Sequence, residues 1–231
     1  MFHEDFYPTP KSVIAKMYDK IQNKEAKHFL EPSAGKGDIP DYIKERRGRY
    51  GDPQFDCIEI VPELAAILKD KGYPVVGYDW MTYDGVCYYD VIIMNPPFSD
   101  GDSHLLRAWD FLHSGEIVCL LNAETLENPY SAERKLLKSI IDQHGHYEIL
   151  GDVFKGSERT TNVNVALVYL KKENADDRVD LWKTETSEKN FEGDLGSSNA
   201  VALQDRLGNM QHFYDEANKH MITAFQHIRK A

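Results

Sequence analysis

The chain has 231 residues, of which 42% are apolar and 28% are charged. This balance excludes a disordered or fibrous protein and is typical of a soluble globular domain. The formal net charge of -11 disfavours binding of a phosphate backbone by the chain alone, because such binding depends on Lys and Arg side chains that neutralise phosphates.

Helices and strands alternate along the first half of the chain. Apolar residues recur at helical spacing after Pro10, and short apolar runs bounded by polar residues and glycines follow. The predicted elements are a helix at 12–22, a strand at 28–30, a helix around 39–43, a strand at 55–60, a helix at 62–71 and strands at 75–78 and 90–94. This order predicts a parallel sheet whose two faces are both covered by helices.

The alternation continues after a polar loop at 99–102. The predicted elements are a helix at 104–112, a strand at 117–121, a helix at 131–143 and strands at 147–154 and 163–170. The last two strands follow each other directly, which indicates an antiparallel pair at one edge. We therefore expect an α/β fold with a mostly parallel seven-stranded sheet, helices on both faces and an antiparallel edge strand.

The composition changes after Lys172. Residues 173–198 are rich in Glu, Asp, Asn, Ser and Gly and are predicted to be a linker or surface excursion. In 199–231 apolar residues step by three and four, which predicts a long amphipathic C-terminal helix. Two interpretations of this helix stay open: it packs on its own domain, or it pairs with a partner. It is also a candidate for the start of a further region.

Other features limit the classes of site. No apolar run approaches the roughly 20 residues of a membrane-spanning helix, and 1–10 lacks the character of a signal peptide, so we expect a cytoplasmic protein. The three cysteines lie in separate apolar stretches and are expected to be core residues. His144 and His146 have no Cys or acidic companion in a metal spacing, and we expect no metal.

A loop with two glycines, 31–38, follows the first predicted strand and precedes a helix. Gly35 and Gly37 have no side chain to block a nucleoside, and the helix start offers N–H groups to a carboxylate or phosphate. Pro40 occupies the position of the third glycine of the dinucleotide fingerprint, and the Gly-Lys-Ser/Thr ending of a phosphate loop is absent. The loop is interpreted either as a nucleoside site or as a tight turn without a ligand.

Acidic residues follow the next two predicted strands. Glu59 comes roughly 20 residues after the glycines, where an acidic side chain can accept hydrogen bonds from both ribose hydroxyls. Asp79 follows the third strand with Trp80 beside it, and the pair is predicted to accept from an adenine amine and cover its ring. A single acid after a strand is typical of a helix cap, but the recurrence favours a ribose-bearing ligand.

The segment 91–98 joins a buried strand directly to Asn-Pro-Pro-Phe at 95–98. Turn chemistry explains Asn and Pro, but it does not explain a large aromatic residue at the carboxyl edge of a parallel sheet, where ligands bind. The chain resembles the S-adenosylmethionine-dependent amino-methyltransferases that modify N6 of adenine in DNA, whose motif is Asn or Asp, Pro, Pro, then Tyr, Phe or Trp. The resemblance extends over roughly 6–170 and includes Phe-Tyr-Pro-Thr-Pro at 6–10.

This resemblance implies a Rossmann-like methyltransferase fold, with 1–172 as the catalytic domain and S-adenosyl-L-methionine as the cofactor. It gives catalytic roles to Asn95, Pro96, Pro97 and Phe98. The expected cofactor contacts are Phe6, Tyr7, Thr9, Pro10, Glu31, Pro32, Ser33, Ala34, Gly35, Gly37, Asp38, Glu59, Ile60, Asp79, Trp80 and Asn95.

The expected chemistry fits these residue types. An exocyclic amine of adenine is a poor nucleophile because its lone pair is delocalised into the ring. If the Asn95 side-chain oxygen and the Pro96 carbonyl accept its N–H bonds, the lone pair is directed at the methyl group. Phe98 would stack on a base rotated out of the duplex, and Phe6 or Tyr7 could attract the sulfonium.

The sequence leaves the substrate open. DNA is the expected partner in a restriction-modification setting, yet the acidic chain lacks the size and basic character of a separate recognition region. Specificity is therefore expected from missing sequence, a recognition subunit or a small inserted loop. The polar loop 155–162 is interpreted either as a phosphate contact or as an exposed hairpin. The alternatives are transfer to RNA or to a protein glutamine, and a binding module that holds the cofactor without transferring methyl.

Overall fold

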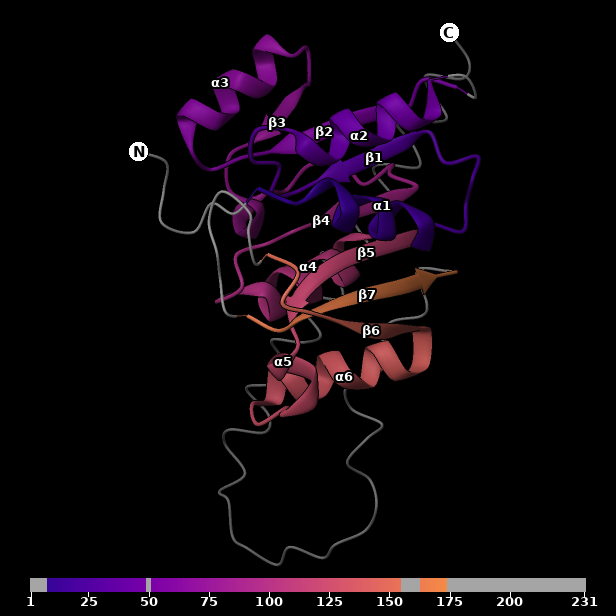
Figure 1. Cartoon of the computed structure of the whole chain (residues 1–231), viewed down its shortest axis with the longest axis vertical. Helices are drawn as coiled ribbons and strands as arrows, with labels where there is room; N and C mark the ends of the chain where they lie inside the picture. The colour runs from indigo at the N-terminus through magenta and orange to yellow at the C-terminus, as the bar shows by residue number, and fades with distance from the viewer. Residues whose placement is uncertain (1–7, 49–50, 155–162, 174–231) are drawn as a thin grey trace, which may run out of the picture. The chain divides into compact units, whose positions relative to one another are not determined.

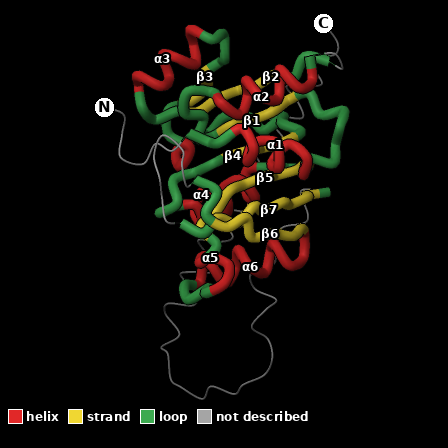
Figure 2. The backbone as a smooth tube through the Cα atoms, in the orientation of Figure 1, coloured by secondary structure: helices red, strands yellow, loops and turns green. Residues whose placement is uncertain are grey.

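A computed structural model describes residues 8–48, 51–154 and 163–173. Its centre is a seven-stranded sheet with the strand order β3-β2-β1-β4-β5-β7-β6. Figure 1 shows β3 with α3 at one end of the sheet and β6 with α6 at the other, and Figure 2 shows the same order as strands flanked by helices. The strands are β1 (His28–Glu31), β2 (Gln54–Ile58), β3 (Val75–Gly77), β4 (Val91–Met94), β5 (Gly115–Asn122), β6 (Gly145–Gly151) and β7 (Val165–Lys172).

All helices predicted for this part of the chain are present, and two short ones were not predicted. The helices are α1 (Lys11–Lys20), α2 (Asp38–Arg47), α3 (Pro62–Asp70), the 3-10 helix η1 (Trp80–Thr82), α4 (Gly101–Phe111), α5 (Glu124–Glu127) and α6 (Ala132–His144). The starts of two helices follow local chemistry: Pro62 occupies the first turn of α3, and the Ser131 hydroxyl accepts from the Arg134 N–H at 3.2 Å before α6.

Both faces of the sheet are buried, as strand β4 illustrates. Val91 and Ile93 lie in one core cluster with residues of α1 and α2, whereas Ile92 and Met94 lie in a second cluster with residues of α4 and α6. All four side chains are fully buried. A strand covered on both sides has no polar face, which explains why the sequence shows continuous apolar runs here and not strict alternation.

The predicted α/β fold is confirmed, including the antiparallel pair of the last two strands, β6 and β7, at one edge. Strand β7 is also antiparallel to β5, so β6 runs parallel to β5. One helix start differs from the prediction. Helix α4 begins at Gly101, within the predicted polar loop. Its start is fixed by tertiary packing, because the buried side chains of Leu105, Ala108 and Trp109 follow at helical spacing.

The predicted linker at 173–198 begins at the last described residue, Glu173, and the predicted C-terminal helix at 199–231 lies outside the described residues. The domain boundary at 172 therefore stays a prediction. None of the helices in the described ranges has the length and apolar character that crossing a bilayer requires.

Candidate functional site

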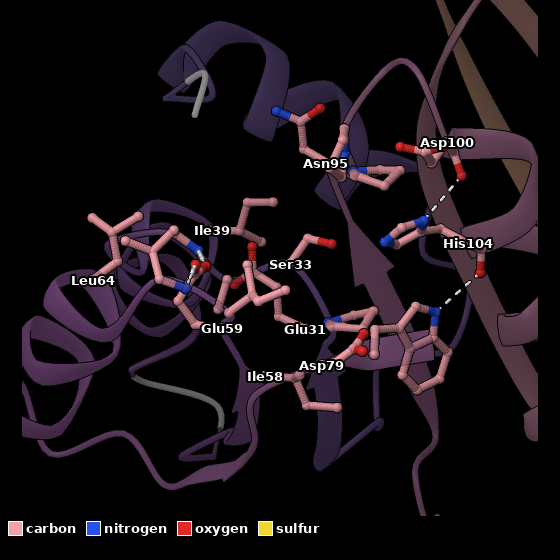
Figure 3. Close-up of a pocket in the computed structure, with 18 of the residues that line it drawn as sticks. Glu31, Ser33, Ile39, Ile58, Glu59, Leu64, Asp79, Asn95, Asp100 and His104 are labelled. Carbon is pink, nitrogen blue, oxygen red and sulfur yellow. Dashed lines mark hydrogen bonds between the residues drawn. The ribbon is translucent and has the colours of Figure 1, made fainter. Parts of the chain in front are cut away.

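A cavity of about 470 Å³ lies where β1, β2, β3 and β4 end, at the carboxyl edge of the sheet. Each strand leads into it through a different loop, and the first turn of α4 closes one side (Figure 3). Its size is typical of a small-molecule site, and a crevice at the carboxyl ends of parallel strands is where ligands bind in open α/β folds. The fold therefore places residues from distant parts of the sequence around one ligand-sized space.

The backbone of the loop between β1 and α2 has positive φ angles at both of its glycines. Gly35 and Gly37 have φ angles of 54° and 87°, in the region that L side chains rarely adopt. A Cβ atom on Gly37 would lie 3.0 Å from Leu68 Cδ2, so its hydrogen side chain also permits packing on α3. Gly35 lines the cavity and Gly37 does not, and the positive φ of Gly37 shapes the turn.

Glu59, just after β2, holds this loop in place. One carboxylate oxygen accepts from the Gly35 N–H at 2.6 Å and the other from the Val61 N–H at 2.8 Å. The side chain is buried, and burial raises the pKa of Glu59 while the backbone hydrogen bonds lower it. Each oxygen retains a second lone pair, so Glu59 can stabilise the loop and still accept from a ligand in the cavity that it lines.

Glu31, at the end of β1, is the most deeply buried acid of the cavity, with 2% of its surface exposed. Its Oε2 atom has no hydrogen-bond partner among the described residues. Burial raises the pKa of Glu31 well above its usual range, and the carboxylates of Asp38 and Glu59 raise it further. A buried acceptor without a donor is costly, and a cationic or N–H-bearing ligand would relieve that cost.

The loops after β2 and β3 contribute both acidic and apolar side chains to one wall of the cavity. Asp79 lines it and also begins η1, because one of its oxygens accepts from the Met81 N–H at 2.9 Å. Ile60 also lines the cavity and is 67% exposed. Trp80 is only 2% exposed and donates from its indole to the His104 carbonyl at 3.2 Å, so its ring belongs to the core. Of these two cavity-lining residues, Ile60 has the more exposed apolar side chain.

The Asn-Pro-Pro-Phe turn follows β4 on the opposite side of the cavity, and all four of its residues line the space. The side-chain amide of Asn95 donates from Nδ2 to the Thr9 hydroxyl at 3.0 Å. Phe98 meets the fully buried Phe154 edge to face, with ring centroids 5.6 Å apart. The turn is thus held from two sides, by the segment before α1 and by the segment after β6.

Residues on the first turn of α4 line the cavity but were not predicted. The Nδ1 atom of His104 lies 2.9 Å from the Asp100 carbonyl, and since a carbonyl only accepts, Nδ1 carries the proton. Figure 3 shows the other ring nitrogen of His104 directed into the cavity, where it is an acceptor when the ring is neutral. The sequence signal was a polar stretch, Ser99–Asp102, which is typical of a loop and concealed the helix start.

Most predicted site residues meet at this cavity. Those that line it are Thr9, Glu31, Pro32, Ser33, Ala34, Gly35, Asp38, Glu59, Ile60, Asp79, Trp80, Asn95, Pro96, Pro97 and Phe98. Two predicted cofactor contacts, Pro10 and Gly37, do not line it; the Pro10 carbonyl accepts from the Val13 and Ile14 N–H groups and begins α1. Phe6 and Tyr7 lie outside the described residues, as does the candidate phosphate-contact loop 155–162.

Comparison with known proteins gives one relative in sequence, and no protein-family model matches the chain. Type II methyltransferase M.CvrRI of Paramecium bursaria Chlorella virus XZ-6E is 30% identical over 111 residues, which are 48% of this chain. The matched part is 27% of the relative, so the chain spans much less than the relative's full length.

Three solved methyltransferases have the same fold. The methyltransferase subunit of a type I restriction-modification system from Streptococcus thermophilus has a TM-score of 0.56 and 14% identity, and the match covers 73% of this chain and 45% of that one. The 23S rRNA methyltransferase ErmE has a TM-score of 0.53 and 15% identity, with 74% of this chain and 72% of that one covered. A dimethyladenosine transferase from Plasmodium falciparum has a TM-score of 0.52 and 14% identity, with 72% of this chain and 62% of that one covered. At these identities the likeness establishes the fold. Together with the match to the type II methyltransferase, it confirms that this chain resembles the S-adenosylmethionine-dependent DNA methyltransferases.

Proposed function

We propose that the protein transfers a methyl group from S-adenosyl-L-methionine to an exocyclic amine, and that the amine is N6 of adenine in DNA. The observation that supports this proposal is that the candidate amine site and the candidate cofactor site share one cavity. The Asn-Pro-Pro-Phe turn after β4 lies on the same 470 Å³ space as the glycine loop and the acids after β1, β2 and β3. This arrangement would place a nucleoside cofactor next to the amine that it methylates.

The residues of the cavity fit this cofactor. Glu31 offers a buried acceptor for the ammonium of its amino acid part, and the glycine loop leaves room at Gly35 for the backbone to approach it. Glu59 would accept from the ribose hydroxyls, Asp79 from the adenine amine, and the exposed Ile60 side chain would pack on the adenine ring. When bound, the cofactor supplies an electrophilic methyl group on a sulfonium sulfur.

Asn95 and Pro96 would act on the amine. An amine conjugated with a purine ring becomes nucleophilic when its nitrogen turns pyramidal, because its lone pair is then localised on the nitrogen. As the nitrogen takes the methyl group, positive charge develops on it and on its two N–H bonds, and the neutral methylated amine is reached when one of these protons is lost to water. The Asn95 Oδ1 atom and the Pro96 carbonyl oxygen would accept those two N–H bonds and stabilise the charge where it develops. The Pro96 carbonyl belongs to a turn of two consecutive prolines after a buried strand, and the Asn95 amide is hydrogen-bonded to the Thr9 hydroxyl, so little reorganisation is needed.

Phe98 would hold the target base by stacking on its face. An enzyme that modifies a base in a duplex must take the base out of the helix, and an aromatic surface offsets part of the cost of unstacking. The edge of Phe154 supports the Phe98 ring from the core side. The support leaves the ring in one orientation before the base arrives.

DNA is the preferred substrate class because the relative is a type II methyltransferase and one structural neighbour belongs to a type I restriction-modification system. The 23S rRNA methyltransferase among the structural neighbours favours RNA as the second candidate substrate. The net charge of -11 disfavours strong binding of either nucleic acid by this chain alone. We therefore include a recognition subunit or a further region of sequence in the proposal.

The test is transfer of label from radiolabelled cofactor to methyl-free DNA, to RNA and to protein, followed by mass analysis of the digested nucleosides. N6-methyladenine from DNA, absent with Asn95→Ala, is the expected result. Label only in RNA or protein would overturn the choice of DNA. If the protein binds the cofactor but labels none of the three, including in a lysate that supplies partner proteins, methyl transfer itself is refuted and a binding module is left.

A further inference from the structure

We propose that Thr9 is a positioning residue: its hydroxyl holds the Asn95 carboxamide in the orientation in which Oδ1 can accept from the target amine. This inference rests on the proposed function and extends it to a residue 86 positions away in sequence. Thr9 was predicted only as a cofactor contact. The hydrogen bond from Asn95 Nδ2 to Thr9 Oγ1, 3.0 Å long, gives it a second and more specific task.

Both ends of this hydrogen bond are attached to rigid parts of the fold. Thr9 stands between Pro8 and Pro10, and the Pro10 carbonyl begins α1 by accepting from two N–H groups at 2.8 and 3.0 Å. Helix α1 is anchored by its buried residues Val13, Ile14 and Met17. On the other side, Asn95 follows four fully buried residues of β4 and precedes Pro96. The backbone of Asn95 is thus fixed, and the freedom that remains is rotation of its side chain.

The rotation of that side chain decides whether the site functions. A carboxamide has two N–H donors on one side and an acceptor oxygen on the other. If the group is turned by half a revolution, it presents N–H donors to an amine that must itself donate, and the amine is repelled. With Nδ2 bonded to the Thr9 hydroxyl, the oxygen occupies the other side. One neutral hydrogen bond biases such an equilibrium by about 2- to 10-fold.

The test compares Thr9→Val, which removes the hydroxyl and keeps the branched shape, with Thr9→Ser, which keeps the hydroxyl. We expect Thr9→Val to lower kcat by about 2- to 10-fold and to leave the KM for substrate within about 2-fold, because the bond matters for amine activation and not for base stacking. Thr9→Ser should restore most of kcat. An unchanged kcat in Thr9→Val, or a loss that serine does not restore, would overturn the proposal.

A measurement without turnover separates this inference from the proposed function. The side-chain amide signals of Asn95 in a ¹H–¹⁵N spectrum are identified by their loss in Asn95→Ala. Slow exchange of these protons with water is expected in the wild type and in Thr9→Ser, and fast exchange in Thr9→Val. If the wild type methylates nothing but this pattern is found, the proposed function fails and the contact stands. Equal exchange in the wild type and Thr9→Val refutes the contact itself.

Discussion

Replacement of Glu59 by glutamine separates its two tasks, holding the glycine loop and binding a ribose. The Glu59 carboxylate accepts from the Gly35 N–H at 2.6 Å and the Val61 N–H at 2.8 Å. Glu59→Gln keeps the length of the side chain but leaves only one acceptor oxygen. One of the two N–H groups then faces an amide that donates, and the ribose loses a charged acceptor.

The size of the effect follows from these contacts. A hydrogen bond to a charged group contributes about 1.5–3 kcal/mol, and Glu59 is only 6% exposed, so water replaces little of it. The neutral amide avoids part of the desolvation that raises the pKa of Glu59, which offsets some of the loss. We expect the free energy of unfolding to fall by about 1–2 kcal/mol and the affinity for cofactor to fall by about 10- to 100-fold.

The assay is calorimetric titration with S-adenosylhomocysteine and with its 2′-deoxy analogue, and urea unfolding reports stability separately. If Glu59 contacts the ribose, the wild type binds the deoxy analogue about 10-fold more weakly, whereas Glu59→Gln discriminates by no more than about 2-fold. Such a difference cannot arise from a loosened loop, which would weaken both ligands equally. The same discrimination in both proteins would refute the ribose contact.

Three further predictions concern catalysis and stability. Asn95→Ala should lower kcat for methyl transfer by about 100- to 1,000-fold in a radiolabel assay and leave the cofactor Kd within about 2-fold; retention of wild-type turnover would contradict its role. Glu31 has a raised pKa in the folded chain, so its cost to stability is absent below the unfolded value of about 4.3 and grows as pH rises. Ligand-free Glu31→Gln should therefore have a higher midpoint urea concentration of unfolding than the wild type at pH 8, but not at pH 4. A difference in midpoint that is the same at both pH values would contradict this prediction. Gly37→Ala and Gly72→Ala both place alanine at a positive φ, but only the Cβ atom at Gly37 would have a near neighbour, Leu68 Cδ2. In urea unfolding, Gly37→Ala should therefore lower the free energy of unfolding by about 1 kcal/mol more than Gly72→Ala does. Equal losses in the two variants would show that contact with Leu68 adds no cost.

The sequence predicted the fold well because each strand carries its own signal. The helices alternate with apolar runs such as Val91–Met94, whose four residues are all buried, and such runs are found in sheets covered on both faces. The position of β7 between β5 and β6 could not be predicted in the same way. Two consecutive antiparallel strands can join a sheet with either the first or the second of them next to the existing strands. Here the long pairing of Gly115–Asn122 with Val165–Lys172 places β7 next to β5 and leaves β6 at the edge.

The cavity residues were predicted where a local pattern marks them. A strand end followed by an acid, a pair of glycines or Asn-Pro-Pro-Phe can be recognised within a few positions. Contacts between residues that are distant in the sequence cannot be predicted in this way. Trp80 was expected to cover a ligand, but its indole bonds to the carbonyl of His104 and its ring packs against Phe111 with centroids 5.3 Å apart. Nothing near residue 80 in the sequence indicates these partners.

Under the proposed function, the charge of the cavity suits the cofactor better than a nucleic acid substrate. Five acids line the cavity: Glu31, Asp38, Glu59, Asp79 and Asp100. They attract a ligand that carries a sulfonium and an ammonium, and in a buried space this attraction is weakly screened. The same charges repel phosphates, and the net charge of -11 adds to that repulsion at low salt. Cofactor affinity and affinity for a nucleic acid backbone are therefore opposed within this chain. Under the proposed function, the uncharged base would enter the cavity while cationic groups elsewhere hold the phosphates. A partner subunit that supplies those cationic groups should then lower the KM for DNA far more than it changes kcat.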